Sequence, residues 1–331
     1  KRITIGDPDN NYATFKAHVL RGAVQHSFSD NLKGNFTASW GDYSKVYANY
    51  FPVGYTPATN IVAMDGYIDT NQRQNLVLSG NLIQLVVFWE LTSLASFLLI
   101  GFWQHKVEAR QGARMALAVT GGGGLALIGG MVLLGLIAGS FDLATILTRG
   151  DMVRGAPLYP LMLGLILLGC FTKSAQFPFH FWLPDAMVAV TPVSAYLHAA
   201  TLVKGGIYLL MRFSPVFAGT TGWTVTLLTV GLVSAVYGAL VALKQHDLKA
   251  LLAYSTVSQL GWIIALIGLG NSAGLAVAAL HTFAHALFKA TLFMLVGIID
   301  REAGSRDIRE LSGLYRVMPV TATAGKRPRK R

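Results

Sequence analysis

Long apolar runs fill the chain from Ser79 onward, and each is close to the roughly 20 residues that a helix needs to cross a bilayer. Short segments with most of the basic residues separate these runs. The pattern predicts an all-α polytopic membrane bundle of about seven transmembrane helices. The expected spans are residues 80–103, 114–140, 158–180, 192–212, 223–243, 248–269 and 274–299.

Residues 1–78 follow a different pattern, in which short segments alternate polar and apolar positions between turn residues. Residues 13–28, a turn at 29–34 and a returning segment at 35–40 predict strand, turn and strand. A few strands cannot close a barrel, so we expect a β-like or irregular block outside the membrane. Its polar and aromatic alternation resembles part of a TonB-dependent outer-membrane receptor; an exposed soluble hairpin is the alternative.

The change of pattern near Leu78 defines the expected domains. They are residues 1–78, a transmembrane bundle at 79–322 and a basic tail at 323–331. A fusion of unrelated sequences would explain the different pattern of residues 1–78. The chain begins with Lys1 rather than methionine, so we expect a fragment or a processed product.

Composition agrees with a membrane protein, because only 13% of the 331 residues are charged whereas soluble domains carry about 25%. The formal net charge of +11 would suit nucleic acid. The basic residues lie mostly in loops between spans, however, where they set membrane topology, and we expect no nucleic-acid partner. The single cysteine, Cys170, supports neither a disulfide nor a metal cluster. We expect no cofactor, no metal and no catalytic residue.

Lysine and arginine in alternate loops predict the orientation of the bundle. One set of loops holds Lys106, Arg110, Arg114, Lys244, Lys249, Arg301, Arg306, Arg309 and Arg316, and the other holds Arg149, Arg154 and Arg212. The bundle is expected in the inner (plasma) membrane of a bacterium. The loop set with more basic residues is expected to face the cytoplasm. Residues 1–78 then lie on the outer side. The cytoplasmic tail is solvated or touches anionic lipid headgroups.

Two titratable residues stand inside the expected spans near a proline-broken helix. Lys173 precedes Pro178, and such a break is tolerated at membrane depth only where it is buried in protein or lines a wet cavity. Placing a lysine there costs roughly 2.5–3.5 kcal/mol, which favours a role in an ion or proton path. Glu90 is a lone acid in its span and is interpreted as a carboxylate that modulates a lysine; a structural buried acid is the alternative.

Further titratable residues follow in later spans. His198 and Lys204 share residues 192–212, and their spacing puts them about 120° apart on one helix. Histidine suits proton relay, whereas a core histidine bonded to a backbone carbonyl is the alternative. Lys249 either reaches inward or anchors the start of its span at the headgroups.

His281, His285 and Lys289 are spaced i, i+4 and i+8, so they line one helical face. Two histidines four residues apart can bind a metal, but HTFAH lacks the glutamate of a zinc-protease motif. A chain of titratable groups along a buried helix is the preferred interpretation.

Four segments carry a family resemblance: KSAQFPFHFWLPDAM, TPVSAYLHAATLVKGGIYLL, HDLKALLAYSTVSQLG and HTFAHALFKATLFMLVG. They are similar to the antiporter-like family that comprises proton-pumping membrane subunits of respiratory complex I and the A subunit of the Mrp-type multisubunit Na⁺/H⁺ antiporter. The resemblance covers about residues 80–322, and Val190 stands where the family usually has proline. The Mrp branch of the family is favoured by Phe177, Phe179, His180, Tyr196, Lys204 and EAGSRDIRELSGL.

The resemblance implies that Glu90 and Lys173 form a coupled pair on neighbouring helices. It also implies that a hydrated path continues through Lys204, His198, Lys249, His281, His285 and Lys289. The expected function is a truncated ion-translocating subunit of a monovalent cation/proton antiporter, which is a secondary transporter and not an enzyme. Its expected partners are other antiporter subunits, the lipid bilayer, protons and Na⁺.

Two alternatives to this function stay open. One is a proton-pumping subunit of complex I, which would be part of an NADH:quinone oxidoreductase, or of a related membrane hydrogenase. The other is a non-functional fusion or fragment that carries a piece of an outer-membrane receptor.

Overall fold

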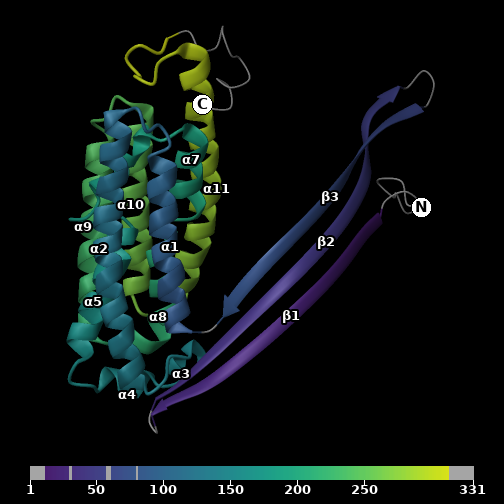
Figure 1. The fold of residues 1–331 in the computed structure, drawn as a ribbon. Coiled ribbons are helices and arrows are strands. Elements are labelled where there is room, and N and C mark those ends of the chain that lie inside the picture. Colours follow the sequence, from purple (N-terminus) through teal and green to yellow (C-terminus); the bar gives the residue numbers. More distant parts are fainter. Residues whose placement is uncertain (1–11, 30–31, 57–60, 80, 313–331) are drawn as a thin grey trace. The chain divides into compact units, whose positions relative to one another are not determined.

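The computed structural model describes residues 12–29, 32–56, 61–79 and 81–312 (Figure 1). The chain divides into two compact units, residues 1–84 and 85–331.

The first unit contains three long strands, β1 (Tyr12–Ser29), β2 (Leu32–Thr56) and β3 (Ile61–Ser79). They form one antiparallel sheet in the order β1–β2–β3. The register pairs residue Tyr12 with Ala48 and Thr37 with Ser79. These strands are longer than the short alternating segments that the sequence pattern predicts.

The rest of the described chain is helical, as predicted. Five helices are long and apolar enough to cross a membrane. They are α1 (Leu82–Ile100), α2 (Val107–Ala138), α9 (Thr221–Ala242), α10 (Leu248–Gly268) and α11 (Ser272–Ala303). Helix α5 (Tyr159–Lys173) is apolar but shorter.

Several shorter helices connect the long ones. At one end of the bundle lie α3 (Leu143–Leu147) and α4 (Gly150–Arg154) (Figure 1). The segment after α5 is built from α6 (Trp182–Asp185), the 3₁₀-helix η1 (Ala186–Val188), α7 (Thr191–Ala195), the π-helix η2 (Tyr196–Ala200) and α8 (Lys204–Phe217).

The structure corrects two of the expected spans. The helix expected at 158–180 ends at Lys173, and the next turn leaves helical geometry at Ala175, whose φ is +50°. The helix expected at 192–212 is interrupted by the π-helix and by Thr201. Lys204 therefore begins a new helix, and the 120° angle between His198 and Lys204, which assumed one continuous helix, was wrong.

Side-chain caps fix where the long helices begin. The Thr220 side chain accepts a hydrogen bond from the Trp223 N–H at the start of α9, and Asp247 does so from Ala250 at the start of α10. Such caps satisfy backbone donors that the first turn leaves free. At the end of α11, Gly304 has a φ of +70°, a conformation that glycine adopts without strain.

Helices α9 and α10 approach each other through glycines. A Cβ at Gly231 would lie 2.7 Å from the Ala265 nitrogen, and one at Gly261 would lie 2.6 Å from the Ala235 nitrogen. Gly238 meets the backbone of α10 in the same way, at 2.6 Å from the Ser258 nitrogen. Small residues permit this close backbone contact between membrane helices.

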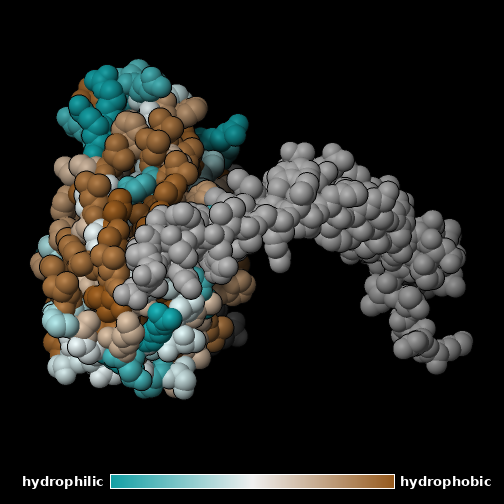
Figure 2. Space-filling view, turned by 60° about the horizontal axis from the view of Figure 1, so that its bottom comes forward, coloured by the Kyte–Doolittle hydropathy of each residue, from teal (hydrophilic) through white to brown (hydrophobic). Residues whose placement is uncertain are grey.

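The outer surface of the bundle is apolar along much of its height (Figure 2). Leu98, Leu125, Leu280 and Phe283 are each more than 60% exposed. Large exposed apolar surfaces of this kind suit a lipid environment or partner helices. Most of the polar residues in this view lie toward the two ends of the bundle (Figure 2).

The described members of the two sets of basic loops lie at opposite ends of the bundle; Arg316 and the predicted tail at 323–331 lie outside the described residues. The connections α1–α2 and α9–α10 and the end of α11 share one end, whereas α3 and α4 lie at the other (Figure 1). At the α3–α4 end, Arg149 and Arg154 donate hydrogen bonds to the carbonyls of Ala138 and Val216.

Candidate functional site

Lys173, the last residue of α5, lies against helix α1. Its side chain is 1% exposed, and its Nζ donates hydrogen bonds to the Trp89 carbonyl at 2.8 Å and the Ser93 Oγ at 2.6 Å. The Nζ also lies 5.1 Å from the centroid of the Trp89 ring. Because Trp89 and Ser93 stand one helical turn apart, two successive turns of α1 hold the lysine.

Glu90 lies beside this contact, next to Trp89 in sequence. No ion pair of 4.0 Å or less joins it to Lys173 in the described residues, but the two charges interact electrostatically. The Glu90 Oε1 is buried and has no hydrogen-bond partner in the same part of the chain. The carboxylate occupies space left by Gly124 of α2, where a Cβ would overlap it. Glu90 and Lys173 therefore lie near each other without a direct salt bridge, and the coupled pair that the resemblance implies stays a prediction.

Glycines of α2 also set the position of α5. A Cβ at Gly123 would overlap the Thr172 side chain, and one at Gly130 would lie 2.7 Å from Ile166. The Trp182 Nε1 donates to the Thr172 carbonyl at 2.9 Å and so ties the chain after the break to the end of α5. These contacts fix the helix end that carries Lys173.

Five further cationic or titratable side chains form a second group on η2, α8, α10 and α11. Each is buried, with exposures of 0% to 7%. The members of this group, called the Lys/His row below, are Lys204, His285, Lys289, His198 and Lys249.

The members of the Lys/His row lie close enough to influence one another's charge. Lys204 and Lys289 both interact electrostatically with His285, and Lys289 and Lys249 do so with His198. Within the described residues, Lys204 Nζ and both ring nitrogens of His198 and His285 have no hydrogen-bond partner. The charges that act on these two histidines are all basic in that part of the chain, unlike the Glu90 carboxylate near Lys173.

Two lysines of the row bind backbone carbonyls. Lys289 Nζ donates to the Leu252 carbonyl of α10 at 3.0 Å. Lys249 Nζ donates to the Ala189 carbonyl, just before α7, at 3.1 Å. Each lysine therefore bridges two elements of the bundle, and Lys249 reaches inward, which was one of the two interpretations left open by the sequence.

His281 differs from its neighbours on α11. It is partly exposed, and its Nε2 lies 2.7 Å from the Gln259 Oε1 of α10. His285 and Lys289, one and two turns later, are fully buried. The part of the chain that the structure describes contains no group of three or more histidine, cysteine or acidic residues that could hold a metal ion.

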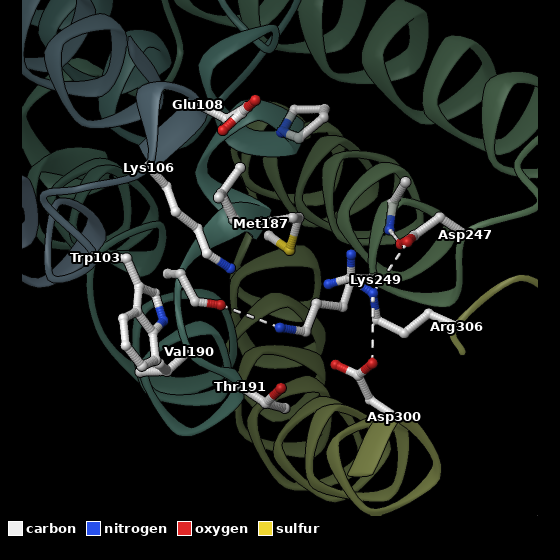
Figure 3. Close-up of a pocket in the computed structure, with 14 residues that line it drawn as sticks. Trp103, Lys106, Glu108, Met187, Val190, Thr191, Asp247, Lys249, Asp300 and Arg306 are labelled. Atoms are coloured by element: carbon white, nitrogen blue, oxygen red, sulfur yellow. Dashed lines mark hydrogen bonds and ion pairs between the residues drawn. The ribbon is translucent and has the colours of Figure 1, made fainter. Parts of the chain in front are cut away.

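A cavity of about 720 Å³ opens beside Lys249 (Figure 3). Arg306 follows α11 and pairs with Asp247 at 3.2 Å and with Asp300 at 3.9 Å. The sequence pattern places Arg306 in a loop, and the predicted site residues include neither Asp247 nor Asp300. Their positions more than 50 residues apart gave no local signal; only the long-range contact between α10 and the segment after α11 brings them together.

Comparison with known families matches residues 79–324 to "NADH:quinone oxidoreductase/Mrp antiporter, TM". This match covers most of the chain, and the chain belongs to that family.

Curated relatives are similar over most of the chain. The chain is 54% identical to the A/B subunit of a probable K(+)/H(+) antiporter of Rhizobium meliloti (strain 1021), over 84% of this chain and 28% of the relative. That share of the chain exceeds what residues 79–331 can supply, so this similarity includes part of the first 78 residues. The A subunit of a Na(+)/H(+) antiporter of Bacillus subtilis (strain 168) is 51% identical over 75% of this chain and 32% of the relative. The chain thus spans about a third of the length of these relatives.

Two solved structures resemble the bundle. A chain of the Mrp complex from Dietzia sp. DQ12-45-1b has a TM-score of 0.70 and 47% identity, over 74% of this chain and 27% of that one. A chain of an archaeal membrane-bound sulfane sulfur reductase has a TM-score of 0.68 and 27% identity, over 74% and 51%.

Proposed function

We propose that this chain is an ion-translocating part of a monovalent cation/proton antiporter subunit, in which protons move along buried lysine, histidine and glutamate side chains. The single observation that carries the proposal is the environment of Lys173. Its ammonium is buried at the end of a broken helix, held by two acceptors on α1, with the Glu90 carboxylate nearby. A lysine in such a place is costly and points to an ion path.

The Lys/His row supplies the groups through which a proton would pass. Like charges at short range in a low-dielectric interior repel strongly. A proton that arrives at one member therefore favours release from its neighbour. Glu90 acts in the opposite sense at Lys173, because an approaching carboxylate favours the charged lysine. Movement of charge between these two regions is the coupling step of the proposed transport, and His281 would connect the row along α11.

The remaining features of the proposal concern the setting of the chain. The bundle at 79–322 would lie in a bacterial inner membrane beside other subunits of a multisubunit complex, and it would exchange protons for Na⁺ or K⁺. The names of the relatives support these partners and ions. The loop set that includes Lys106 would face the cytoplasm, because it is the richer in basic residues.

The test is a Lys173→Ala substitution in the complete antiporter assembly that contains this chain. In membrane vesicles, Na⁺- or K⁺-driven proton movement, followed with a pH-sensitive dye, is expected to fall by about a hundredfold. Lys244→Ala is the matched control, because Lys244 is an exposed lysine at the end of α9, and it should transport at the parent rate. Undiminished transport by Lys173→Ala with normal assembly would refute the proposal.

A redox-driven proton pump is the second candidate, and the likeness to the sulfane sulfur reductase favours it. The lower identity of that match, 27% against 47% for the Mrp chain, places it second. The two functions differ in their driving force. A cation gradient alone drives proton movement by an antiporter, whereas a redox pump needs an electron donor in the same vesicles.

A further inference from the structure

The cavity beside Lys249 is lined by charged side chains from four segments of the bundle (Figure 3). They are Lys106 and Glu108 of the α1–α2 corner, Asp247 and Lys249 of α10, Asp300 of α11, and Arg306. Lys249 belongs both to this cavity and to the Lys/His row, and its side chain points toward the Ala189 carbonyl inside the bundle. The cavity therefore joins the buried row to one end of the molecule.

Arg306 is held in place by the backbone as well as by its side chain. The Leu248 N–H donates to the Arg306 carbonyl at 3.1 Å, and the Ile308 N–H donates to the His246 carbonyl at 3.0 Å. These bonds fix the segment after α11 against the start of α10. Since the backbone is fixed on both sides of it, the guanidinium reaches the two carboxylates without rearrangement of the loop.

Asp247 and Asp300 interact electrostatically with Lys249, yet neither forms an ion pair with it among the described residues. Both pair with Arg306 instead. Asp247 is also bound by its own helix, because its Oδ1 accepts the Ala250 N–H at 2.9 Å. Asp300 has no such second anchor on its side chain in the described region, so Asp300 is the acid that loss of Arg306 would release.

We infer that the cavity is an aqueous vestibule through which Lys249 exchanges protons with one side of the membrane, and that Arg306 is a positioning residue that keeps Asp300 from capturing Lys249. The inference rests on the proposed function for its consequence in transport. A direct lysine–carboxylate pair stabilises the charged lysine. By occupying Asp300, Arg306 leaves Lys249 free to give up its proton to the row or to water.

The role of Arg306 is tested by a double substitution in the complete antiporter. Arg306→Gln is expected to lower proton movement about fivefold, and Asp300→Asn in the same chain is expected to restore most of it, because the released carboxylate is gone. Arg306→Lys, which keeps the charge, should stay near the parent rate. The control is Arg309→Gln, since Arg309 pairs only with Asp307 in the described segment and lies outside the vestibule.

Two results would overturn this role. One is an Arg306→Gln chain that transports at the parent rate. The other is an Arg306→Gln chain that loses transport and gains nothing from Asp300→Asn, because a merely structural clamp between α10 and the following segment would behave in that way.

The vestibule itself is tested without any transport measurement. The native thiol Cys170 is fully buried, so an introduced cysteine gives the labelling signal. Thr191→Cys, on the vestibule wall, should react with a membrane-impermeant cationic thiol reagent from one face of sealed vesicles, as read by mass shift. Met152→Cys on α4, a residue that is 53% exposed at the other end of the bundle, should react from the opposite face.

The outcomes separate this inference from the proposed function. A Thr191→Cys chain that reacts from neither face removes the vestibule, even where Lys173→Ala abolishes transport. A chain that reacts, but whose transport before and after labelling is the same, removes the role of the vestibule as a proton entrance. If Thr191→Cys reacts as expected but the Lys173→Ala variant transports normally, only the proposed function is refuted.

Discussion

Lys173 and Lys204 stand at the two ends of the irregular segment between α5 and α8, and their surroundings are opposite. Both are buried, with exposures of 1% and 7%. Lys173 has two hydrogen-bond acceptors and a nearby carboxylate, whereas Lys204 has no hydrogen-bond partner in the described chain. Burial of a lysine therefore does not by itself define its part in the molecule; the acceptors around the ammonium do.

The difference suggests a division of labour along the proposed path. At Lys173 the protein compensates a positive charge with oriented acceptors, so this site holds charge at a defined position. At Lys204 a positive charge meets His285 and Lys289 and, in the described chain, no compensating acid, so it is electrostatically opposed. Substitutions at and around the two lysines test this contrast between a compensated and an uncompensated charge.

The largest expected effect is that of Gly124→Ala. The added Cβ would overlap the Glu90 carboxylate, so the acid or helix α2 must move, at a cost of about 3 kcal/mol. Thermal unfolding of the purified complex measures the loss, and transport should fall with it. Gly122→Ala is the matched control, because nothing lies within 4 Å of its Cβ. Equal stability of the two variants would show that the Glu90 carboxylate does not need the space left by Gly124.

Replacing each lysine by methionine compares the two sites directly. Lys204→Met removes an uncompensated polar group and should stabilise the bundle by about 1–2 kcal/mol. Lys173→Met strips a donor from the Trp89 carbonyl and the Ser93 hydroxyl and should destabilise it by about 1–3 kcal/mol. Unfolding temperatures of the two variants provide the measurement. Shifts of the same sign would contradict the division between the sites.

A smaller effect is expected for Ser93→Ala. This change removes one of the two acceptors of the Lys173 ammonium, together with its hydrogen bond of 2.6 Å. The free energy of unfolding should fall by about 1–2 kcal/mol. Transport at limiting cation concentration is the readout. Thr291→Ala on α11 serves as the control, since its hydroxyl bonds only its own helix in the described structure. A Ser93→Ala chain that behaves like the control would leave the Trp89 carbonyl as the sole important acceptor.

The smallest effect lies outside the membrane. Arg309 lowers the pKa of Asp307 from 3.8 to about 2 through side-chain and backbone hydrogen bonds. A carboxyl whose pKa is lower in the folded state stabilises that state above its ordinary pKa, and the contribution is lost as the pH falls from about 4 to about 2. Hydrogen exchange of residues 305–310 should therefore accelerate over this range. Asp307→Asn should remove the pH dependence; if the dependence persisted, its source would be another group.

Sequence pattern predicted the long helices well, because an apolar run of membrane length leaves the backbone few alternatives to a helix. It also placed Lys173 at a break, since Pro178 cannot continue a helix. The prediction failed over 192–212, where the apolar run is continuous but the α-helix is interrupted. The π-helix at Tyr196–Ala200 depends on packing against α11, which the local pattern does not contain.

The candidate site was predictable as a set of residues and not as an arrangement. Titratable side chains in apolar runs are visible in the sequence, and all eight candidates lie in helical segments of the bundle. Their partners were not visible. The Trp89 and Ala189 carbonyls that bind Lys173 and Lys249 are backbone atoms, and any residue type could have supplied them. Whether the eight residues carry protons stays a prediction.

The glycine contacts between α9 and α10 have a mechanical consequence. Where backbones touch at Gly231, Gly238 and Gly261, a sliding motion would press one main chain into the other. The two helices are then expected to move together as one rigid unit. Rearrangement during the proposed transport cycle would therefore fall on the short elements around this helix pair, such as those between Trp182 and Lys204.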